Sequence, residues 1–246
     1  MCGRLVVKVP DLSVFEQPFG VIQRGSFVWE PRFNLAPSQL APVVTNEAAR
    51  RLELFRFGLI PEWAADMRRA KLLINARVET VAELRSFRRA LATRRCIVPV
   101  SGYYEWQVQG GRKRPLFIQA GDAATLPLAG VWERWQSRDG QAIEGFAVLT
   151  RPAAGFLQAI HERMPLTVPM QHLERWLDPG EQSPEALATI LSSEPDITHW
   201  SAREVAPLVN SAHYDAPDCI APYDGAVVPV DRQLDLFATP AATPQR

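Results

Sequence analysis

Four strand-like segments follow one another over residues 96–150, and this run constrains the fold more than any other part of the chain. The segments are CIVPVSGYYEWQV, RPLFIQ, LPLAGVWERW and EGFAVLT, and the turn signals GG, GD and RDG separate them. β-Branched and aromatic residues favour strands, and glycine-containing pairs favour tight turns between antiparallel neighbours. The run therefore predicts an antiparallel meander.

The same residue types predict further strands at residues 5–9, 41–45 and 52–60. Helical patterns are found at residues 79–95, 153–164, 170–178 and 184–193. In the longest of these, apolar residues recur at helical spacing, namely at Val81, Leu84, Phe87 and Leu91. Thr80 and Glu83 have the spacing of a capping box at its start, and Ser183 before Pro184 is typical of the start of the last helix.

These elements predict an α+β fold: a single domain over residues 1–225, with a mostly antiparallel, barrel-like sheet and peripheral helices. A chain of 246 residues, 47% of them hydrophobic, is long enough for one large domain with a real core. Residues 226–246 are rich in Pro, Ala and Thr, which predicts a disordered tail. No apolar run approaches the ~18 residues of a membrane helix, and no signal peptide is evident, so we expect a cytoplasmic protein.

The charge is balanced overall but unevenly distributed. The chain has 27 Lys and Arg against 27 Asp and Glu, and only Lys8, Lys71 and Lys113 are lysines. Residues 50–95 hold twelve basic and five acidic side chains, whereas residues 174–235 hold three and twelve. Arginine suits phosphate and base stacking, so a local basic face is compatible with DNA binding. The alternative is that these charges simply cover solvated helix faces.

Three cysteines, Cys2, Cys96 and Cys219, are widely spaced and form no CxxC pair. This pattern argues against a disulfide framework and against a structural zinc site, and we expect neither a metal nor a cofactor. Cys96 opens the apolar run CIVPV, which predicts a buried core residue.

Cys2 gains unusual chemistry if Met1 is removed, because it then carries a free α-amine beside its thiol. The reference pKa values of these groups are about 7.7–8.0 and about 8.5, so a useful fraction of the amine is neutral and can attack an aldehyde. The neighbouring thiol can then close on the imine carbon, an intramolecular step that gives a five-membered thiazolidine. A cysteine at position 2 is not specific evidence when taken alone.

Six motifs that begin with this cysteine occur in a fixed order along the chain. They are MCGR at 1–4, RFNLAPSQ at 32–39, GLIPEW at 58–63, INARVET at 74–80, SGYYEW at 101–106 and IHERMP at 160–165. VxxxVN follows at 205–210. Together they resemble the SRAP (SOS-response-associated peptidase) family, whose members cross-link to abasic sites. The resemblance covers roughly residues 2–222. It implies that the chain senses abasic sites in single-stranded DNA and shields them during replication.

The resemblance implies four active-site residues, namely Cys2, Asn75, Glu105 and His161. Cys2 matches the nucleophile, and Asn75 matches the amide that orients the terminal amine and the sugar remnant. Glu105 matches the carboxylate that handles protons during ring opening and imine formation. His161 matches the histidine that assists Schiff-base chemistry and reversal of the cross-link. Carbinolamine steps need such a proton shuttle.

Three of these residues also have structural explanations, which would be preferred without the resemblance. Asn75 could cap or turn the chain before the predicted helix. Glu105 lies between aromatic residues of a predicted strand, where an unpaired buried carboxylate would be costly. His161 lies near the end of a predicted helix, where an imidazolium would favour the helix dipole.

The resemblance further implies DNA contacts. Positions that hold the DNA backbone are matched by Arg4, Arg77, Arg85, Thr150 and Arg163. Pro37 and Trp63 match apolar positions that wedge against or stack on bases, with Trp106 as a neighbour. Stacking contributes ~1–3 kcal/mol per base and tolerates any sequence, which suits a lesion without a base. The chain departs from the family in having Phe57 before Gly58, and in lacking a second tryptophan after Trp63.

Three other functions stay open from the sequence alone. Cys2 could be the nucleophile of a cysteine peptidase assisted by His161 and Glu105, and the removal of its own Met1 could even be the only proteolytic reaction of that peptidase. The chain could be a non-catalytic module that binds single-stranded DNA. The imine could also proceed to β-elimination, which would make the protein a weak lyase that ring closure suppresses. In each case we expect a monomer associated with the nucleoid and no membrane partner.

The tail contains the segment QLDLF at residues 233–237. It resembles the short peptide by which bacterial replication and repair proteins dock on the sliding clamp. The residues expected to bind the clamp are Gln233, Leu234, Leu236 and Phe237. A flexible tether of this kind would raise the local concentration of the domain at the replication fork. The alternative is a terminal strand packed on the domain.

Overall fold

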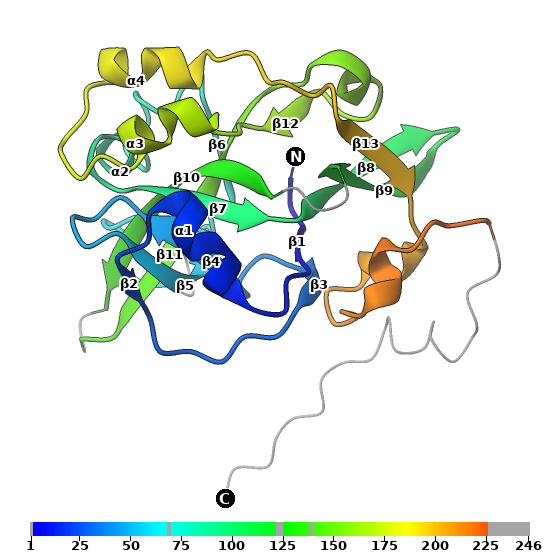
Figure 1. Cartoon of the computed structure of the whole chain (residues 1–246), viewed down its shortest axis with the longest axis horizontal. Helices are drawn as coiled ribbons and strands as arrows, with labels where there is room; N and C mark the ends of the chain where they lie inside the picture. The colour runs from blue at the N-terminus through cyan, green and yellow to red at the C-terminus, as the bar shows by residue number, and fades with distance from the viewer. Residues whose placement is uncertain (1, 68–69, 122–124, 138–139, 226–246) are drawn as a thin grey trace, which may run out of the picture.

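The computed structural model describes residues 2–67, 70–121, 125–137 and 140–225, which form two sheets surrounded by short helices (Figure 1). The segment with Gln233, Leu234, Leu236 and Phe237 lies outside the described residues, so clamp binding stays a prediction. Within the part of the chain described, no helix is long and apolar enough to cross a membrane.

The larger sheet closes into a five-stranded barrel. Its strands, in order, are β11 (Ala142–Pro152), β10 (Leu126–Gln136), β7 (Arg95–Val100), β4 (Leu40–Thr45) and β5 (Arg51–Phe57). β5 pairs back onto β11 in parallel, whereas the other pairs around the ring are antiparallel. Three short strands extend the sheet, namely β2 (Gln23–Arg24), β6 (Asn75–Arg77) and β12 (Arg163–Pro165). This architecture confirms the expected α+β fold with a mostly antiparallel, barrel-like sheet.

Two glycines allow the barrel to close. The Gly58 amide donates to the Phe146 carbonyl at 2.8 Å, and a Cβ on Gly145 would lie 2.5 Å from the Gly58 oxygen. Gly58 has a φ of +124°, a conformation that residues with a side chain rarely adopt. The glycine of the GLIPEW motif is therefore required by the backbone at the junction of β5 and β11.

The second sheet is antiparallel and lies beside the barrel. Its strands, in order, are β13 (Trp200–Glu204), β9 (Arg112–Ala120), β8 (Gly102–Gln109), β1 (Leu5–Val7) and β3 (Arg32–Leu35). The predicted strand over 96–108 is in fact two strands, β7 and β8, in different sheets. The chain changes sheet at Gly102, where a Cβ would lie 2.5 Å from the Ile118 carbonyl oxygen.

The core has two parts. The main cluster fills the barrel and extends to the second sheet, and it includes Cys2 and Cys96. Cys96 is fully buried, as predicted. A smaller cluster joins Tyr104 and Phe117 on the other face of the second sheet to Val205 and Val209. The C-terminal segment of the described chain therefore packs on the second sheet rather than on the barrel.

The helices are short and peripheral (Figure 1). They are α1 (Glu16–Phe19), α2 (Arg88–Thr93), α3 (Leu173–Trp176) and α4 (Pro184–Leu191). The 3₁₀ segments are η1 (Leu12–Phe15), η2 (Gly155–Ala159), η3 (Met170–His172), η4 (Pro207–Asn210) and η5 (Pro217–Ile220). Ser183 caps α4 by accepting from the Ala186 amide at 3.2 Å, as its position before Pro184 indicates.

The prediction of a helix over 79–95 is largely wrong, because only Arg88–Thr93 is helical. The preceding residues form successive turns, and the expected capping box is absent, since the helix N-cap is Phe87. Val81 and Phe87 are buried as the spacing suggests, but Leu84 is exposed. The segment starts as strand β6 and the Val78 amide still bonds the Thr150 carbonyl, so pairing with β11 overrides the helical preference.

The helix predicted over 153–164 is also wrong. The chain forms the 3₁₀ segment η2 and then strand β12, which pairs with the end of β11. The Ala153 amide donates to the Glu162 carbonyl at 2.9 Å and draws the chain into this antiparallel pair. His161 therefore lies just after the end of η2, in the loop before β12, and its amide donates to the Leu157 carbonyl at 3.0 Å. The segment predicted as a helix over 170–178 is split between η3 and α3.

Candidate active site around Cys2

Cys2 lies three residues before the start of β1 and is buried in the main core cluster, with 1% of its surface exposed. The Tyr104 amide donates to the Arg4 carbonyl at 3.0 Å, so this end of the chain runs along β8. Burial raises the pKa of the Cys2 thiol far above its ordinary range, and the nearby Glu105 charge acts in the same direction. The thiol is therefore protonated at neutral pH and needs a base before it can react as a nucleophile.

Asn75 is the direct neighbour of Cys2. It opens β6, which pairs in parallel with Val148–Thr150 of β11. Its side-chain Nδ2 donates to the Cys2 carbonyl at 3.0 Å. Among the residues that the structure describes, the other amide atom, Oδ1, is buried and has no hydrogen-bond partner. An acceptor left open in this position suits a donor on an incoming group or on the terminal amine.

Glu105 comes from β8 and is only 4% exposed. Its Oε1 accepts from the Trp106 amide at 3.3 Å. Side chains two residues apart on a strand share a face, so Tyr103 lies on the same side of β8. Burial, followed by the charges of Cys2 and Glu105, raises the pKa of Tyr103 well above its usual value. Sequence reasoning missed Tyr103, although its spacing from Glu105 was a usable signal.

His161 lies in the loop just before β12, the strand that pairs with the last residues of β11. Thr150 pairs with Arg77 of β6 on one side and with Pro165 of β12 on the other. The Arg163 amide donates to Nδ1 of His161 at 3.0 Å. A neutral ring that accepts at Nδ1 carries its proton on Nε2. The structure thus joins Cys2 to Asn75 by a hydrogen bond and places Glu105 close enough for its charge to act on the Cys2 thiol. His161 lies on the loop before β12, and β12 pairs with the same end of β11 as β6, the strand of Asn75.

The Arg4 side chain contacts the C-terminal segment of the described chain, at residues 209–210. Its Nη1 donates to Asn34 Oδ1 and to the Val209 carbonyl, both at 2.7 Å, and burial lowers its pKa. The Trp106 indole donates to Asn210 Oδ1 at 2.8 Å. The VxxxVN motif at 205–210 therefore holds both Arg4 and Trp106, and Asn34 is a buried contact that sequence reasoning missed.

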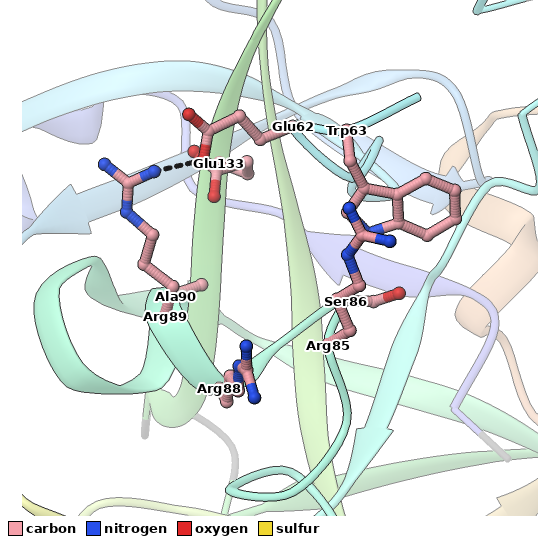
Figure 2. A pocket seen from close by; sticks show the side chains of 8 residues that line it. All are labelled: Glu62, Trp63, Arg85, Ser86, Arg88, Arg89, Ala90 and Glu133. Carbon is pink, nitrogen blue, oxygen red and sulfur yellow. Dashed lines mark hydrogen bonds and ion pairs between the residues drawn. The ribbon is translucent and has the colours of Figure 1, made fainter. Parts of the chain in front are cut away.

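A second group of predicted residues lines a cavity of about 430 Å³ on the outside of the barrel (Figure 2). Trp63 is 54% exposed, and the Arg85 guanidinium lies 5.2 Å from its ring centre. Sequence reasoning missed Arg88 and Arg89, which line the same cavity, although the basic bias of 50–95 pointed to this segment. An exposed aromatic ring beside three arginines offers a surface for stacking and for phosphate.

Two acidic residues complete the lining of this cavity. Glu62 forms an ion pair with Arg89, as the dashed line in Figure 2 marks. Glu133 is 5% exposed and pairs with Arg94 at 2.6 Å. Burial raises the pKa of Glu133, and Arg94 opposes that shift. The positive charge of Arg89 is thus compensated by Glu62 on one side of the cavity. On the other side, Arg85 lies over the Trp63 ring.

The remaining predicted DNA contacts are spread around the fold. Arg77 is exposed at the end of β6, and Thr150 is fully buried, with Oγ1 donating to the Ala76 carbonyl at 3.4 Å. Pro37 lies in the turn between β3 and β4, beside Ser38, whose φ is +70°. Of the residues described, neither Pro37 nor Trp63 is joined to Cys2 by a hydrogen bond. No group of three or more His, Cys, Asp or Glu in the described ranges could hold a metal ion.

The chain is thus a barrel domain with a buried cysteine near its N-terminus. The side-chain amide of Asn75 bonds the backbone of this cysteine, and the charge of Glu105 acts on its thiol. The family model described as SOS response associated peptidase (SRAP) matches residues 1–212, and the chain belongs to this family. This confirms the resemblance that the six motifs carry.

Named relatives agree with this assignment. The chain is 34% identical to abasic site processing protein YoaM of Bacillus subtilis over 216 residues, covering 86% of this chain and 93% of that protein. It is 28% identical to abasic site processing protein HMCES of Rattus norvegicus, covering 79% of this chain and 65% of that protein. A crystal structure of a protein from Bacteroides thetaiotaomicron superposes with a TM-score of 0.78 at 25% identity, covering 90% of this chain and all of that one.

Proposed function

We propose that this protein captures abasic sites in single-stranded DNA covalently, through Cys2 after removal of Met1, and so shields the lesion during replication. The observation that carries the proposal is the hydrogen bond from Asn75 to the Cys2 carbonyl, with Glu105 close enough to act on the pKa of the thiol. The relatives named abasic site processing proteins support the same lesion as the substrate.

The first covalent step joins the α-amine of Cys2 to the aldehyde of the ring-opened sugar. The nitrogen lone pair attacks the carbonyl carbon, and the resulting carbinolamine loses one water to give an imine. Ring opening, proton removal from nitrogen and departure of water each need a proton donor or acceptor. Glu105 supplies a carboxylate, His161 supplies Nε2–H, and Asn75 Oδ1 can accept from the amine.

The second step closes the ring. The Cys2 sulfur adds to the imine carbon, the S–H proton leaves to a base, and the imine nitrogen gains a proton, so no oxidant or reductant is needed. The amine reacts first, because the carbon that the thiol attacks becomes an imine carbon only after the first step, and Glu105 is the base that takes the thiol proton. The intramolecular addition has a large advantage in effective concentration.

The cavity around Trp63 provides the non-covalent part of the capture. A base next to the lesion stacks on Trp63, and Arg85 and Arg88 face the phosphates. None of these contacts requires a particular base, which suits a lesion defined by a missing base. An unpaired strand exposes its bases for such stacking, so single-stranded DNA is the preferred substrate.

Borohydride trapping with two Cys2 variants tests the proposal. Wild-type protein is expected to give a heat-stable adduct without borohydride, whereas Cys2→Ser gives at most an imine that borohydride must trap. An adduct from Cys2→Ala that survives heating without borohydride would contradict thiazolidine formation. Cleavage of added peptides that depends on Cys2, without any DNA adduct, would instead favour a peptidase.

A further inference from the structure

Glu79 belongs to the INARVET motif but has no part in the chemistry above. Its carboxylate receives both arms of the Arg163 guanidinium, with Nη1 to Oε1 at 2.6 Å and Nη2 to Oε2 at 2.8 Å. The Arg163 side chain is only 9% exposed, and Nη2 also donates to the Thr150 carbonyl at 2.5 Å. Bidentate pairing of this kind fixes a guanidinium in position as well as in orientation.

Arg163 is also the residue whose backbone amide bonds His161 Nδ1, at 3.0 Å. The backbone amide of Arg163 takes no part in the hydrogen bonds between β11 and β12. The bond at this end of the pair runs from the Ala153 amide to the carbonyl of Glu162. Arg163 is the next residue along the strand, and in an antiparallel pair its amide therefore points away from β11. Arg163 therefore has a side chain anchored on Glu79 and a main chain that contacts the histidine.

We propose that Glu79 and Arg163 are positioning residues that hold His161 in its loop with the proton on Nε2. The inference rests on the proposed function, since it concerns the histidine assigned to proton transfer there. The amide of Arg163 needs the lone pair of Nδ1, and the Glu79–Arg163 pair keeps that amide in place. If the anchor is removed, the hydrogen bond from the Arg163 amide to Nδ1 weakens, and the preference for a proton on Nε2 falls with it.

The same geometry bears on the alternative that Arg163 binds a DNA phosphate. Both Nη atoms are already bonded to Glu79 and Thr150, and Nε is buried. A phosphate would have to displace Glu79 from the guanidinium. Loss of Glu79 would then strengthen DNA binding, whereas the positioning role predicts unchanged binding and slower chemistry.

The experiment compares full-length wild type with Glu79→Gln and Arg163→Met, and uses Glu83→Gln, an exposed glutamate of the same segment, as a matched control. Long-range proton–nitrogen NMR of protein with ¹⁵N-labelled histidine reports the tautomer of each of the four histidines, with His161→Ala for assignment. We expect an Nε2–H signature for His161 in wild type and Glu83→Gln. Averaged nitrogen shifts are expected in Glu79→Gln and Arg163→Met.

Cross-linking kinetics on abasic single-stranded DNA give the second readout. The maximal rate should fall about tenfold or more in Glu79→Gln and Arg163→Met, as for residues that orient other functional imidazoles, with an unchanged half-saturating DNA concentration. Arg163→Lys, which keeps the charge but lacks the fork, should lie between them and wild type. A wild-type tautomer with a wild-type maximal rate in Glu79→Gln would overturn the inference, as would tighter DNA binding as its only effect. The tautomer measurement needs no DNA, so it decides this inference even if wild type forms no adduct and the proposed function fails.

Discussion

The side-chain amide of Asn75 donates a hydrogen bond to the backbone carbonyl of Cys2 at 3.0 Å, across 73 positions of the chain. This bond connects Cys2 to strand β6 and, because β6 pairs with β11, to the end of β11. It restrains the backbone of Cys2, from which the proposed amine and thiol nucleophiles both extend. Preorganisation of this kind reduces the entropy that is lost in the reaction.

Asn75→Asp should slow cross-link formation. The aspartate has nearly the same shape but cannot donate to the Cys2 carbonyl, which would leave a buried acceptor unsatisfied at a cost of about 1–3 kcal/mol. A loss of about fivefold or more in the single-turnover rate corresponds to the lower end of that range. Single-turnover kinetics at saturating DNA measure it, with thermal unfolding as a check on the fold. A wild-type rate in a folded variant would remove Asn75 from the site.

Glu105→Gln should have the largest effect on rate among the variants outside Cys2. The amide keeps the size of the side chain but cannot take a proton, and general acid–base groups contribute about 10²–10⁴-fold. The maximal cross-linking rate should therefore fall within that range, while the half-saturating DNA concentration stays the same. Glu181→Gln, at an exposed position away from the site, is the control. Equal losses in rate and affinity would indicate a binding role for Glu105 instead.

The cavity of Trp63 should be responsible for much of the affinity for single strands. Arg85→Gln and Arg88→Gln should each reduce the salt dependence of binding, by about 0.7 in the slope of log K against log salt for every phosphate that the variant no longer neutralises. Trp63→Ala should weaken binding by about 1–3 kcal/mol without a change in that slope. Fluorescence anisotropy with an undamaged single strand measures both. Arg112→Gln, exposed in the β8–β9 hairpin, should match wild type, and identical slopes in all variants would rule out the cavity as the DNA site.

Folding stability should fall in acid, in part through Glu204. The Arg114 guanidinium bonds this carboxylate between β9 and β13 and holds its pKa below the usual range. A carboxyl with a depressed folded pKa stabilises the fold above its unfolded pKa, about 4.3, and that contribution is lost as the pH falls through the folded pKa. Thermal unfolding between neutral and acidic pH should show a shallower loss for Glu204→Gln than for wild type. A parallel pH dependence in the two proteins would contradict this assignment.

Sequence patterns predict the strands of the barrel far better than the segments that carry the site. β10 and β11 lie where the apolar runs place them, because a buried strand rich in β-branched and aromatic residues leaves a local signature. β6 and β12 do not, since each has three residues and exists only because β11 offers an edge. Val81, Phe87 and Leu91 are buried, as the predicted helix over 79–95 requires, but only α2 within that range is helical. Residues 75–77 pair with β11 as a strand, so the chain enters this range in an extended conformation.

The site residues were reached through motifs rather than through periodicity. Cys2, Asn75 and Glu105 come from three separate segments, and no local pattern indicates that they meet. Sequence patterns did not single out Tyr103, Glu79 and Arg88, because what marks each of them is a neighbour from another part of the chain. These neighbours are Cys2 for Tyr103, Arg163 for Glu79 and Trp63 for Arg88. The basic bias of 50–95 pointed to the right segment for Arg88, but only the fold brings it beside Trp63.

Covalent capture through Cys2 is tested by the intact mass of the purified full-length protein, measured before and after incubation with abasic single-stranded DNA. We expect free protein that lacks Met1, and an adduct whose mass is the sum of protein and DNA less one water. We also expect that heating leaves this adduct intact and that borohydride adds no hydrogen to it, because the closed ring contains no imine. Retention of Met1 together with full adduct formation, or the absence of any adduct, would contradict capture through the Cys2 amine and thiol.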